Sequence, residues 1–179
     1  MSVAFKNPSE SLTIMNELVL PNDTNTLNNL MGGRLLHWMD IAAAISAQKH
    51  SNNIVVTASV DNVSFKKAIK LGDVITISAK VTRSFTTSME VRLEVWTENI
   101  PTGDKAKSNE AFYTFVAVDG DGKAVKVPEL IPETNEEKQF FYGALRRRQL
   151  RLIFGGKMKP KDALELKALF LNDQEWNYF

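Results

Sequence analysis

The chain contains no cysteine, which excludes disulfide bonds, thiolate metal sites and a cysteine nucleophile. This absence suits a reducing compartment, so a cytoplasmic location is expected. Histidine is scarce as well: His37 and His50 are its only two occurrences, and no carboxylate cluster with metal-site spacing accompanies them. No bound metal is therefore expected.

The chain also has almost no net charge and no long apolar run. The 22 Lys and Arg residues nearly balance the 21 Asp and Glu residues, so neither nucleic acid nor an anionic membrane is an expected partner. No run reaches the ~18 apolar residues of a membrane-spanning helix, and the stretch MSVAFKNPSESLT lacks the apolar core of a signal peptide. With 179 residues, 44% of them hydrophobic, the chain has the composition of a soluble globular protein.

Hydrophobic periodicity predicts one helix and several strands in the first part of the chain. The helix starts near Gly32 and Gly33 and runs to about His50, and its apolar positions leave no clean polar face. Such a helix is expected at the centre of a domain, wrapped by other elements. Alternating or continuously apolar stretches predict strands at 12–20, 54–65, 73–85, 88–98 and 109–119. This order indicates an α+β fold in which a curved antiparallel sheet wraps around one central helix.

The pattern also predicts which side chains face solvent and where the character of the chain changes. Strict alternation in 88–98 turns Glu90, Arg92 and Glu94 outward. The DGDG sequence at 119–122 predicts a hairpin turn into a strand formed by KAVKVP. Two helices are expected after Pro132, separated by paired glycines and a proline. We therefore expect a main domain at 1–132 and a C-terminal helical extension at 133–179.

Asp40 stands in the middle of the apolar helix, where a carboxylate needs an explanation. Aspartate is a poor helix former, and burial without partners raises the pKa of a carboxyl group. The preceding stretch TNTLNNLMGG places polar side chains and two glycines at the helix start, whose unpaired N–H groups can hold a developing oxyanion. A carboxylate two turns further on could polarise a water for attack on an acyl carbon. The alternative is an aspartate at the rim of the helix that accepts a hydrogen bond from a loop.

Several blocks of sequence, in a fixed order, match one known family: DTN, GGRLLHWMD, VTASVDNVSF, LGDVITISAKVTRSFTTSMEVRLEVW and TFVAVD. Together they resemble the hotdog-fold acyl-CoA thioesterases, especially the acyl-CoA hydrolases that include short bacterial enzymes and the animal brain-type enzyme. The resemblance covers residues 12 to about 127, and EEKQFFYGALRRRQLRL is similar to the tail of the animal enzyme. It implies hydrolysis of fatty acyl-CoA to CoA and a carboxylic acid, with no cofactor. It also implies self-association as a hotdog dimer, assembled into a hexameric trimer of dimers.

The resemblance assigns roles to residues around the helix start. Asp40 matches the family's catalytic aspartate, as general base or nucleophile, and Asn25 matches the asparagine that places the carbonyl or the water. Gly32 and Gly33 match the paired glycines, and the Gly33 amide is the candidate oxyanion donor. The family's active site straddles the dimer interface, so Asn25 and Asp40 of one site can come from different subunits. The chain departs from the family at Asn28, usually Gly, and at Met31, usually Phe or a small residue.

Binding of CoA requires polar and basic groups for its phosphates. Ser64 is a candidate for a supporting polar role near the thioester, against the alternative of an ordinary strand residue. Arg147 lies in the basic run RRRQLR, where it either reaches a CoA phosphate across an oligomer interface or belongs to a solvated helix face. The remaining candidates follow the second strand or join two later strands: Lys66, Arg83, Thr86, Thr87 and Ser88.

Two other functions are open. A hotdog enoyl-CoA hydratase or dehydratase uses an Asp and His pair, and His37 lies on the wrong side of Asp40 for that arrangement. His37 could still contact Asp40 at its i, i+3 spacing, or form a hydrogen bond at a subunit contact. A non-catalytic acyl-CoA-sensing module needs no carboxylate at the thioester, so Asp40 disfavours it. His50 is expected to end the helix, where positive charge suits the dipole.

Overall fold

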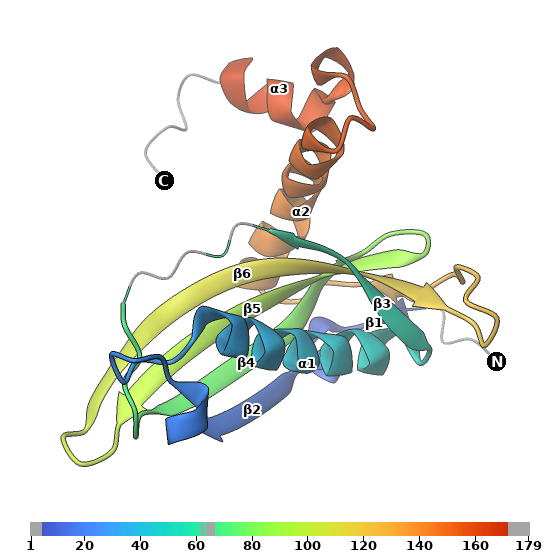
Figure 1. Ribbon diagram of the computed structural model, residues 1–179. Coiled ribbons are helices and arrows are strands. Elements are labelled where there is room, and N and C mark those ends of the chain that lie inside the picture. Colours follow the sequence, from blue (N-terminus) through green and yellow to red (C-terminus); the bar gives the residue numbers. More distant parts are fainter. Residues whose placement is uncertain (1–4, 62, 64–66, 172–179) are drawn as a thin grey trace. The chain divides into compact units, whose positions relative to one another are not determined.

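The computed structural model describes residues 5–61, 63 and 67–171, with side chains up to residue 168. The chain divides into two units, residues 1–133 and residues 134–179. In the first unit, helix α1 (Gly32–Ser51) lies against a curved sheet of five strands in the order β2–β4–β5–β6–β3, with all neighbours antiparallel (Figure 1). The strands are β2 (Thr13–Leu18), β3 (Ile54–Asp61), β4 (Val74–Ser84), β5 (Ser88–Asn99) and β6 (Asp104–Val118). The predicted α+β plan is confirmed.

Helix α1 begins and ends through backbone conformation rather than through side-chain caps. Met31 precedes it in an extended conformation, and no side chain caps the first turn. Asn52 follows it in the left-handed region, with φ of 54°, and its N–H donates to the carbonyl of Gln48. Lys6 donates to the carbonyl of Lys49 and to Oδ1 of Asn52, so a buried ammonium group satisfies the negative end of the helix.

One face of the sheet and one side of α1 form the core. Met39, Ala42 and Ala43 of the helix are fully buried, as are the alternating apolar residues of β4 and β5: Ile75, Ile77, Ala79, Val81, Met89, Val91, Leu93 and Val95. Glu90 departs from the alternation, because it is 0% exposed instead of facing solvent. A bulge in β4 between Val81 and Arg83 sets Thr82 beside it, and the Thr82 hydroxyl donates to Oε1 of Glu90 at 2.8 Å. The expectation that Glu90 points into solvent is wrong.

Short elements complete the first unit. Strands β1 (Phe5–Lys6) and β7 (Glu129–Leu130) pair in parallel, and 3-10 turns occupy Pro8–Ser11 and Pro21–Asp23. The strand expected after the turn at 119–122 is reduced to an isolated bridge between Val118 and Ala124. The chain then leaves the sheet, and the N–H of Val127 donates to the carbonyl of Thr86 in the turn between β4 and β5.

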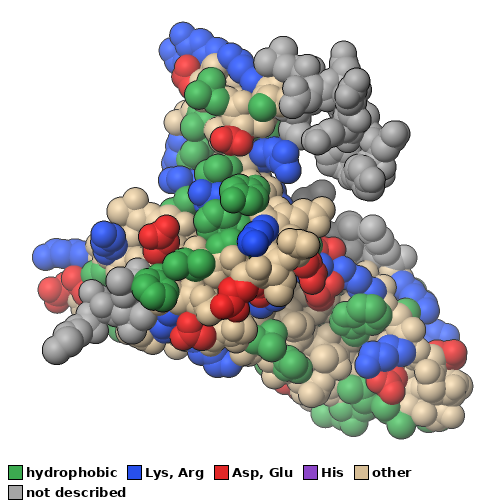
Figure 2. Space-filling view, turned by 180° about the vertical axis from the view of Figure 1, so that it is seen from behind, with side chains coloured by type: hydrophobic (Ala, Val, Ile, Leu, Met, Phe, Trp, Pro, Cys, Tyr) green, Lys and Arg blue, Asp and Glu red, His purple; other side chains and the backbone are tan. Residues whose placement is uncertain are grey.

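The second unit contains helices α2 (Asn135–Phe154) and α3 (Leu164–Leu171), with a 3-10 turn at Pro160–Asp162 between them. A capping box starts α2: Thr134 accepts from the N–H of Glu137, and Glu137 accepts from the N–H of Thr134. Basic, apolar and a few acidic side chains are intermingled over this unit (Figure 2). Within the described part of the chain, no helix combines the length and apolar character needed to cross a membrane.

His50 does not carry the positive charge expected of it at the end of α1. Its ring is fully buried, and Nε2 lies 2.9 Å from the carbonyl of Pro128, to which it donates. Burial lowers the pKa of His50 below its ordinary value of 6.5, and the nearby charge of Lys6 lowers it further. The folded protein therefore holds this histidine neutral.

Folding stability is expected to fall as the pH drops below about 6.5, because the unfolded chain then protonates His50 while the folded chain does not. The contribution is fully present above the unfolded pKa and is lost as the pH falls through the lower folded pKa. Thermal unfolding of wild type and of His50→Gln between pH 7.5 and 5.5 measures it, since glutamine can still donate to Pro128. The variant should show a flatter dependence on pH; equal slopes would contradict the assignment.

Candidate active site

Asp40 lies in the third turn of α1 and is held by the edge strand β3. Its Oδ1 accepts a hydrogen bond of 2.9 Å from the hydroxyl of Thr57. A bulge follows in β3, where Thr57 pairs with Phe115 of β6 but Ser59 pairs with Thr114. Bulges bend a strand and re-aim its side chains, which fits a hydroxyl directed at the helix. The partner of Asp40 is thus a strand residue that the sequence did not single out, although it lies in the VTASVDNVSF block.

Asn25 has its side chain fixed by the loop before α1. Its Oδ1 accepts from the N–H groups of Leu27, at 2.9 Å, and Asn29, at 3.2 Å. The carboxamide oxygen is therefore occupied, and the NH2 group is the part left to meet a ligand. Asn28 adopts the left-handed conformation, with φ of 56°. Asparagine tolerates this region better than other non-glycine residues, so the departure from the family's glycine keeps the shape of the turn.

Gly32 and Gly33 form the first turn of α1, where N–H groups have no partner within the helix. A side chain built at Gly33 would meet nothing within 4 Å, so its backbone is open to a ligand. A cavity of about 360 Å³ lies beside this turn and brings together Asn25, Gly32 and Lys67, with Asn29, Leu30, Leu35, Ala68 and Ile69 as its other walls. The structure therefore places the loop asparagine and the helix start at one cavity.

Asp40 does not line that cavity, and the described residues of one chain form no hydrogen bond between Asp40 and Asn25. Seven residues separate Gly33 from Asp40, or about 10 Å along the helix axis at ~1.5 Å per residue. The carboxylate and the helix-start amides thus lie on one side of the helix without touching. Within one chain, the site consists of two halves, Asp40 with Thr57 and Asn25 with Gly32; Gly33 belongs to the same first turn of α1 but does not line the cavity.

The surface around Asp40 is apolar and open. Ile41 and Ile45 of α1 are 38% and 40% exposed, and Val60 of β3 is 48% exposed. Ile54 and Val56 are exposed as well, but on the other face of β3 from Thr57. The expectation that other elements wrap the whole of α1 is therefore wrong for this stripe. Because β3 is at the edge of the sheet, the apolar stripe of the helix and an unpaired strand edge lie next to each other.

The predicted CoA-binding residues are spread over the structure. Arg83 lies near the end of β4 with its guanidinium over the ring of Phe85; Thr86 and Thr87 belong to the following turn, and Ser88 begins β5. This turn is at the far end of β4 from the cavity beside Gly32, roughly 30 Å away at ~3.3 Å per strand residue. Arg147 belongs to α2, where its Nη2 donates to the carbonyl of Phe140 at 2.9 Å. Ser64 and Lys66 lie outside the described residues.

A second cavity adjoins the first and carries lysines that the sequence did not single out as a group. Its volume is about 540 Å³, and it shares Lys67 and Ala68 with the cavity beside Gly32. Lys70 and Lys105 add two further ammonium groups, together with Asp73, Thr97, Asn99, Thr102, Asp104 and Ala106. These residues come from the loop before β4 and from the β5–β6 hairpin, which are distant in sequence.

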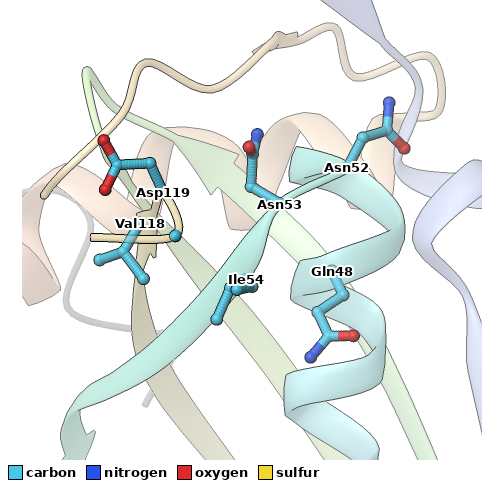
Figure 3. A pocket seen from close by; sticks show the side chains of 7 residues that line it. Gln48, Asn52, Asn53, Ile54, Val118 and Asp119 are labelled. Carbon is cyan, nitrogen blue, oxygen red and sulfur yellow. The ribbon is translucent and has the colours of Figure 1, made fainter. Parts of the chain in front are cut away.

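A third cavity, of about 470 Å³, lies at the opposite end of α1 (Figure 3). Side chains of Gln48 and Asn52 reach it from the helix and Asp119 from the turn after β6. Its polar groups are largely occupied, since Asn52 accepts from Lys6 and Asp119 accepts from two backbone N–H groups. It offers no reactive group comparable to Asp40. The described residues also contain no cluster of three side chains able to hold a metal ion.

A helix packed against a curved five-stranded antiparallel sheet is the arrangement of the hotdog fold. The Thioesterase superfamily matches residues 27–103. The uncharacterized acyl-CoA thioester hydrolase YkhA of Bacillus subtilis is 41% identical over 167 residues, which cover 93% of this chain and 94% of that protein. The chain belongs to the thioesterase superfamily, and its resemblance to the hotdog acyl-CoA thioesterases is confirmed.

Solved structures agree with this assignment. The crystal structure of an apo-hexameric acyl-CoA thioesterase aligns with a TM-score of 0.82 at 40% identity, over 86% of this chain and 98% of that one. The acyl-CoA hydrolase of Staphylococcus aureus, solved with butyryl coenzyme A, coenzyme A and coenzyme A disulfide, aligns with a TM-score of 0.77 at 37% identity, over 92% of this chain and 99% of that one.

Proposed function

We propose that Asp40 is the reacting carboxylate of an acyl-CoA thioester hydrolase that releases CoA and a free carboxylic acid. The chain is an acyl-CoA thioester hydrolase, an activity it shares with relatives that match nearly its whole length. The role of Asp40 rests on one observation: in the third turn of the central helix, its carboxylate accepts a hydrogen bond from Thr57. A mid-helix carboxylate with one oxygen oriented and its surroundings apolar is suited to act on a thioester.

Residue spacing supports this set of residues. The Staphylococcus aureus hydrolase has been solved with alanine in place of an asparagine, of an aspartate 15 residues later, and of a threonine 17 residues after that aspartate. Asn25, Asp40 and Thr57 have the same spacing here. The three residues that hydrogen bonding singles out in this chain thus correspond by spacing to three that were chosen for replacement in a 37% identical enzyme.

Two routes are consistent with the geometry. As general base, Asp40 takes a proton from water while the water oxygen attacks the acyl carbon, and the tetrahedral intermediate then expels CoA as thiolate, which is protonated. As nucleophile, Asp40 attacks the acyl carbon, CoA leaves, and water hydrolyses the resulting anhydride. In both routes an oxyanion develops on the carbonyl oxygen, and the Asn25 NH2 group and the Gly33 N–H are the donors placed to stabilise it.

We further infer that one site is completed by two copies of the chain. Asn25 and Asp40 lie in separate halves of the site within one chain, and the apolar stripe beside Asp40 continues to the edge strand β3. A second copy that covers this stripe would bury exposed isoleucine and valine side chains and could bring its own Asn25 to Asp40. Hexameric relatives support a homo-oligomer, and we propose the dimer as its unit.

The phosphates of CoA are assigned to the lysine-lined cavity that adjoins the one beside Gly32. Replacing Lys67 and Lys70 together by glutamine is expected to raise KM for acyl-CoA roughly tenfold and to leave kcat nearly unchanged, because the ammonium groups meet the nucleotide and not the thioester. Steady-state kinetics at low and high salt measures the effect, which should shrink as salt screens the charges.

Lys126→Gln is the matched control, since Lys126 is exposed and lines neither cavity. The double variant and the control should differ at low salt by the full change in KM. Equal KM values for both variants would show that the lysine-lined cavity does not bind the CoA phosphates. The remaining candidates for that role would then be Arg83, Thr86, Thr87, Ser88 and Arg147. Lys66 stays a prediction for the same role, and Ser64 stays a prediction for a polar role near the thioester.

Thiol release from a panel of acyl-CoA esters tests the function as a whole. Hydrolysis predicts a free thiol and a carboxylic acid from saturated substrates, with no added cofactor. A hydratase would instead consume the conjugated absorbance of enoyl-CoA, and a sensor would bind the esters without releasing thiol. Either result would replace the proposal. The cytoplasmic location expected from the absence of cysteine stays a prediction.

A further inference from the structure

Tyr113 carries a buried hydroxyl group that the fold does not use. The residue lies on β6, faces α1 and is 1% exposed. Its hydroxyl has no hydrogen-bond partner among the described residues. Buried hydroxyl groups are nearly always paired, so each exception asks for a partner that the single chain does not supply.

The position of Tyr113 in the sheet places it next to the Asp40 half of the site. Thr57 pairs directly with Phe115, and Tyr113 is two residues along the same strand, so all three side chains point to the helix face. A diagonal neighbour across two strands is within reach of a long aromatic side chain. Thr57 in turn donates to Asp40, which therefore stands over this corner of the sheet.

The charge of Asp40 reaches the Tyr113 hydroxyl. Burial raises the pKa of Tyr113 to about 12, and the negative charge of Asp40 contributes to that rise. The hydroxyl is therefore protonated at all pH values at which the enzyme would work, and it is available as a donor. Thr57 donates to Oδ1 of Asp40, which leaves the second carboxylate oxygen, Oδ2, to accept from another donor.

We propose that Tyr113 is a positioning residue for the hydrolysis: its buried hydroxyl donates to a water that bridges it to the Asp40 carboxylate, and so holds the carboxylate together with Thr57. The inference rests on the proposed role of Asp40. Two donors from two neighbouring strands fix both the rotation and the tilt of a carboxylate, whereas Thr57 alone fixes one oxygen. The hydroxyl also gives a water bound at Asp40 a fixed neighbour on the side of the sheet.

The fold itself offers no reason for a tyrosine at this position. Phenylalanine would fill the same volume without an unpaired hydroxyl, as Phe115 does on the same face. A buried donor without a partner destabilises the folded chain. A buried hydroxyl that packing does not need, within reach of the charge of Asp40, is what a functional requirement produces.

Tyr113→Phe is expected to lower kcat roughly tenfold, the usual effect of removing one hydrogen bond to a charged group, with little change in KM. Its melting temperature should stay close to that of wild type, because phenylalanine fills the same buried volume. Tyr142→Phe is the matched control, because Tyr142 lies on α2 and is 64% exposed. Unchanged kcat in Tyr113→Phe would overturn the inference.

Combining the variant with Asp40→Asn separates positioning from a general effect on the fold. A residue that acts through Asp40 has nothing left to position in the Asp40→Asn background, so adding Tyr113→Phe should cost less than about twofold there. The same tenfold loss in both backgrounds would overturn the positioning role. Full activity of Asp40→Asn alone would refute the proposed function itself, which distinguishes the two failures.

Discussion

Asp40→Asn lowers kcat for acyl-CoA hydrolysis by about 100-fold or more, while the chain still folds and binds CoA. The carboxamide has nearly the shape of the carboxylate, and its oxygen can still accept the Thr57 hydroxyl that now reaches Oδ1 of Asp40 at 2.9 Å. It can neither take a proton from water nor attack an acyl carbon at a useful rate. General bases and nucleophiles are each worth factors of this size or larger.

The measurement is thiol release at saturating acyl-CoA, with CoA affinity measured by calorimetry on the same preparation. Folding is checked by the melting temperature, which should change little because the Thr57 contact persists. The control is His37→Asn, one turn before Asp40 and exposed, for which near-normal turnover is expected. Near-wild-type turnover of Asp40→Asn would refute the catalytic role of Asp40. A strong loss of turnover in His37→Asn would instead indicate that His37 and Asp40 act as a catalytic pair.

The sequence identifies Asp40 as a candidate catalytic residue because it is a carboxylate in an otherwise apolar helix. It gives no such signal for Thr57. A carboxylate between Met39 and Ile41 is visible in a list of letters. The hydroxyl that orients it becomes visible only when β3 lies against α1 with a bulge in its pairing to β6. Strand alternation indicates which face a residue occupies but not which helix residue lies above it.

The errors have the same origin. Glu90 was expected in solvent because alternation treats every polar residue as outward, and the β4 bulge that gives it a buried partner leaves no local signal. Tyr113 could not be found for a different reason. In an apolar strand it looks like an ordinary core aromatic residue, and the sequence does not show that its hydroxyl lacks a partner in the described part of the chain. Lys70 and Lys105 meet at one cavity only through the approach of a loop and a hairpin some 35 positions apart in the chain.

Helix α1 has apolar residues on all sides, yet the structure leaves part of its surface exposed. A helix without a polar face predicts complete wrapping, but Ile41 and Ile45 remain exposed next to an edge strand. Both observations agree if the last layer around the helix comes from another copy of the chain. The helix would then be central in the assembled protein and not in the single chain.

A site shared between two copies makes a prediction that no single-chain site makes. Asn25→Ala and Asp40→Asn should each abolish most turnover alone. In a two-fold dimer of one copy of each, one site receives both defects and the other receives neither. Random assembly at equal amounts therefore restores about a quarter of wild-type activity, because half of the dimers are mixed and half of their sites are intact.

Co-expression of the two variants with different affinity tags measures this, with mass spectrometry to establish that mixed dimers form. The matched control pairs Asp40→Asn with Thr57→Val. Thr57 contacts Asp40 of its own chain, so mixed dimers of these two variants have no site with both residues intact and should gain nothing over their parents. If Asn25→Ala and Asp40→Asn form mixed dimers and still show only the summed activity of their parents, both residues act from one chain. A thioester would then have to span the two turns of α1 that separate Gly33 from Asp40.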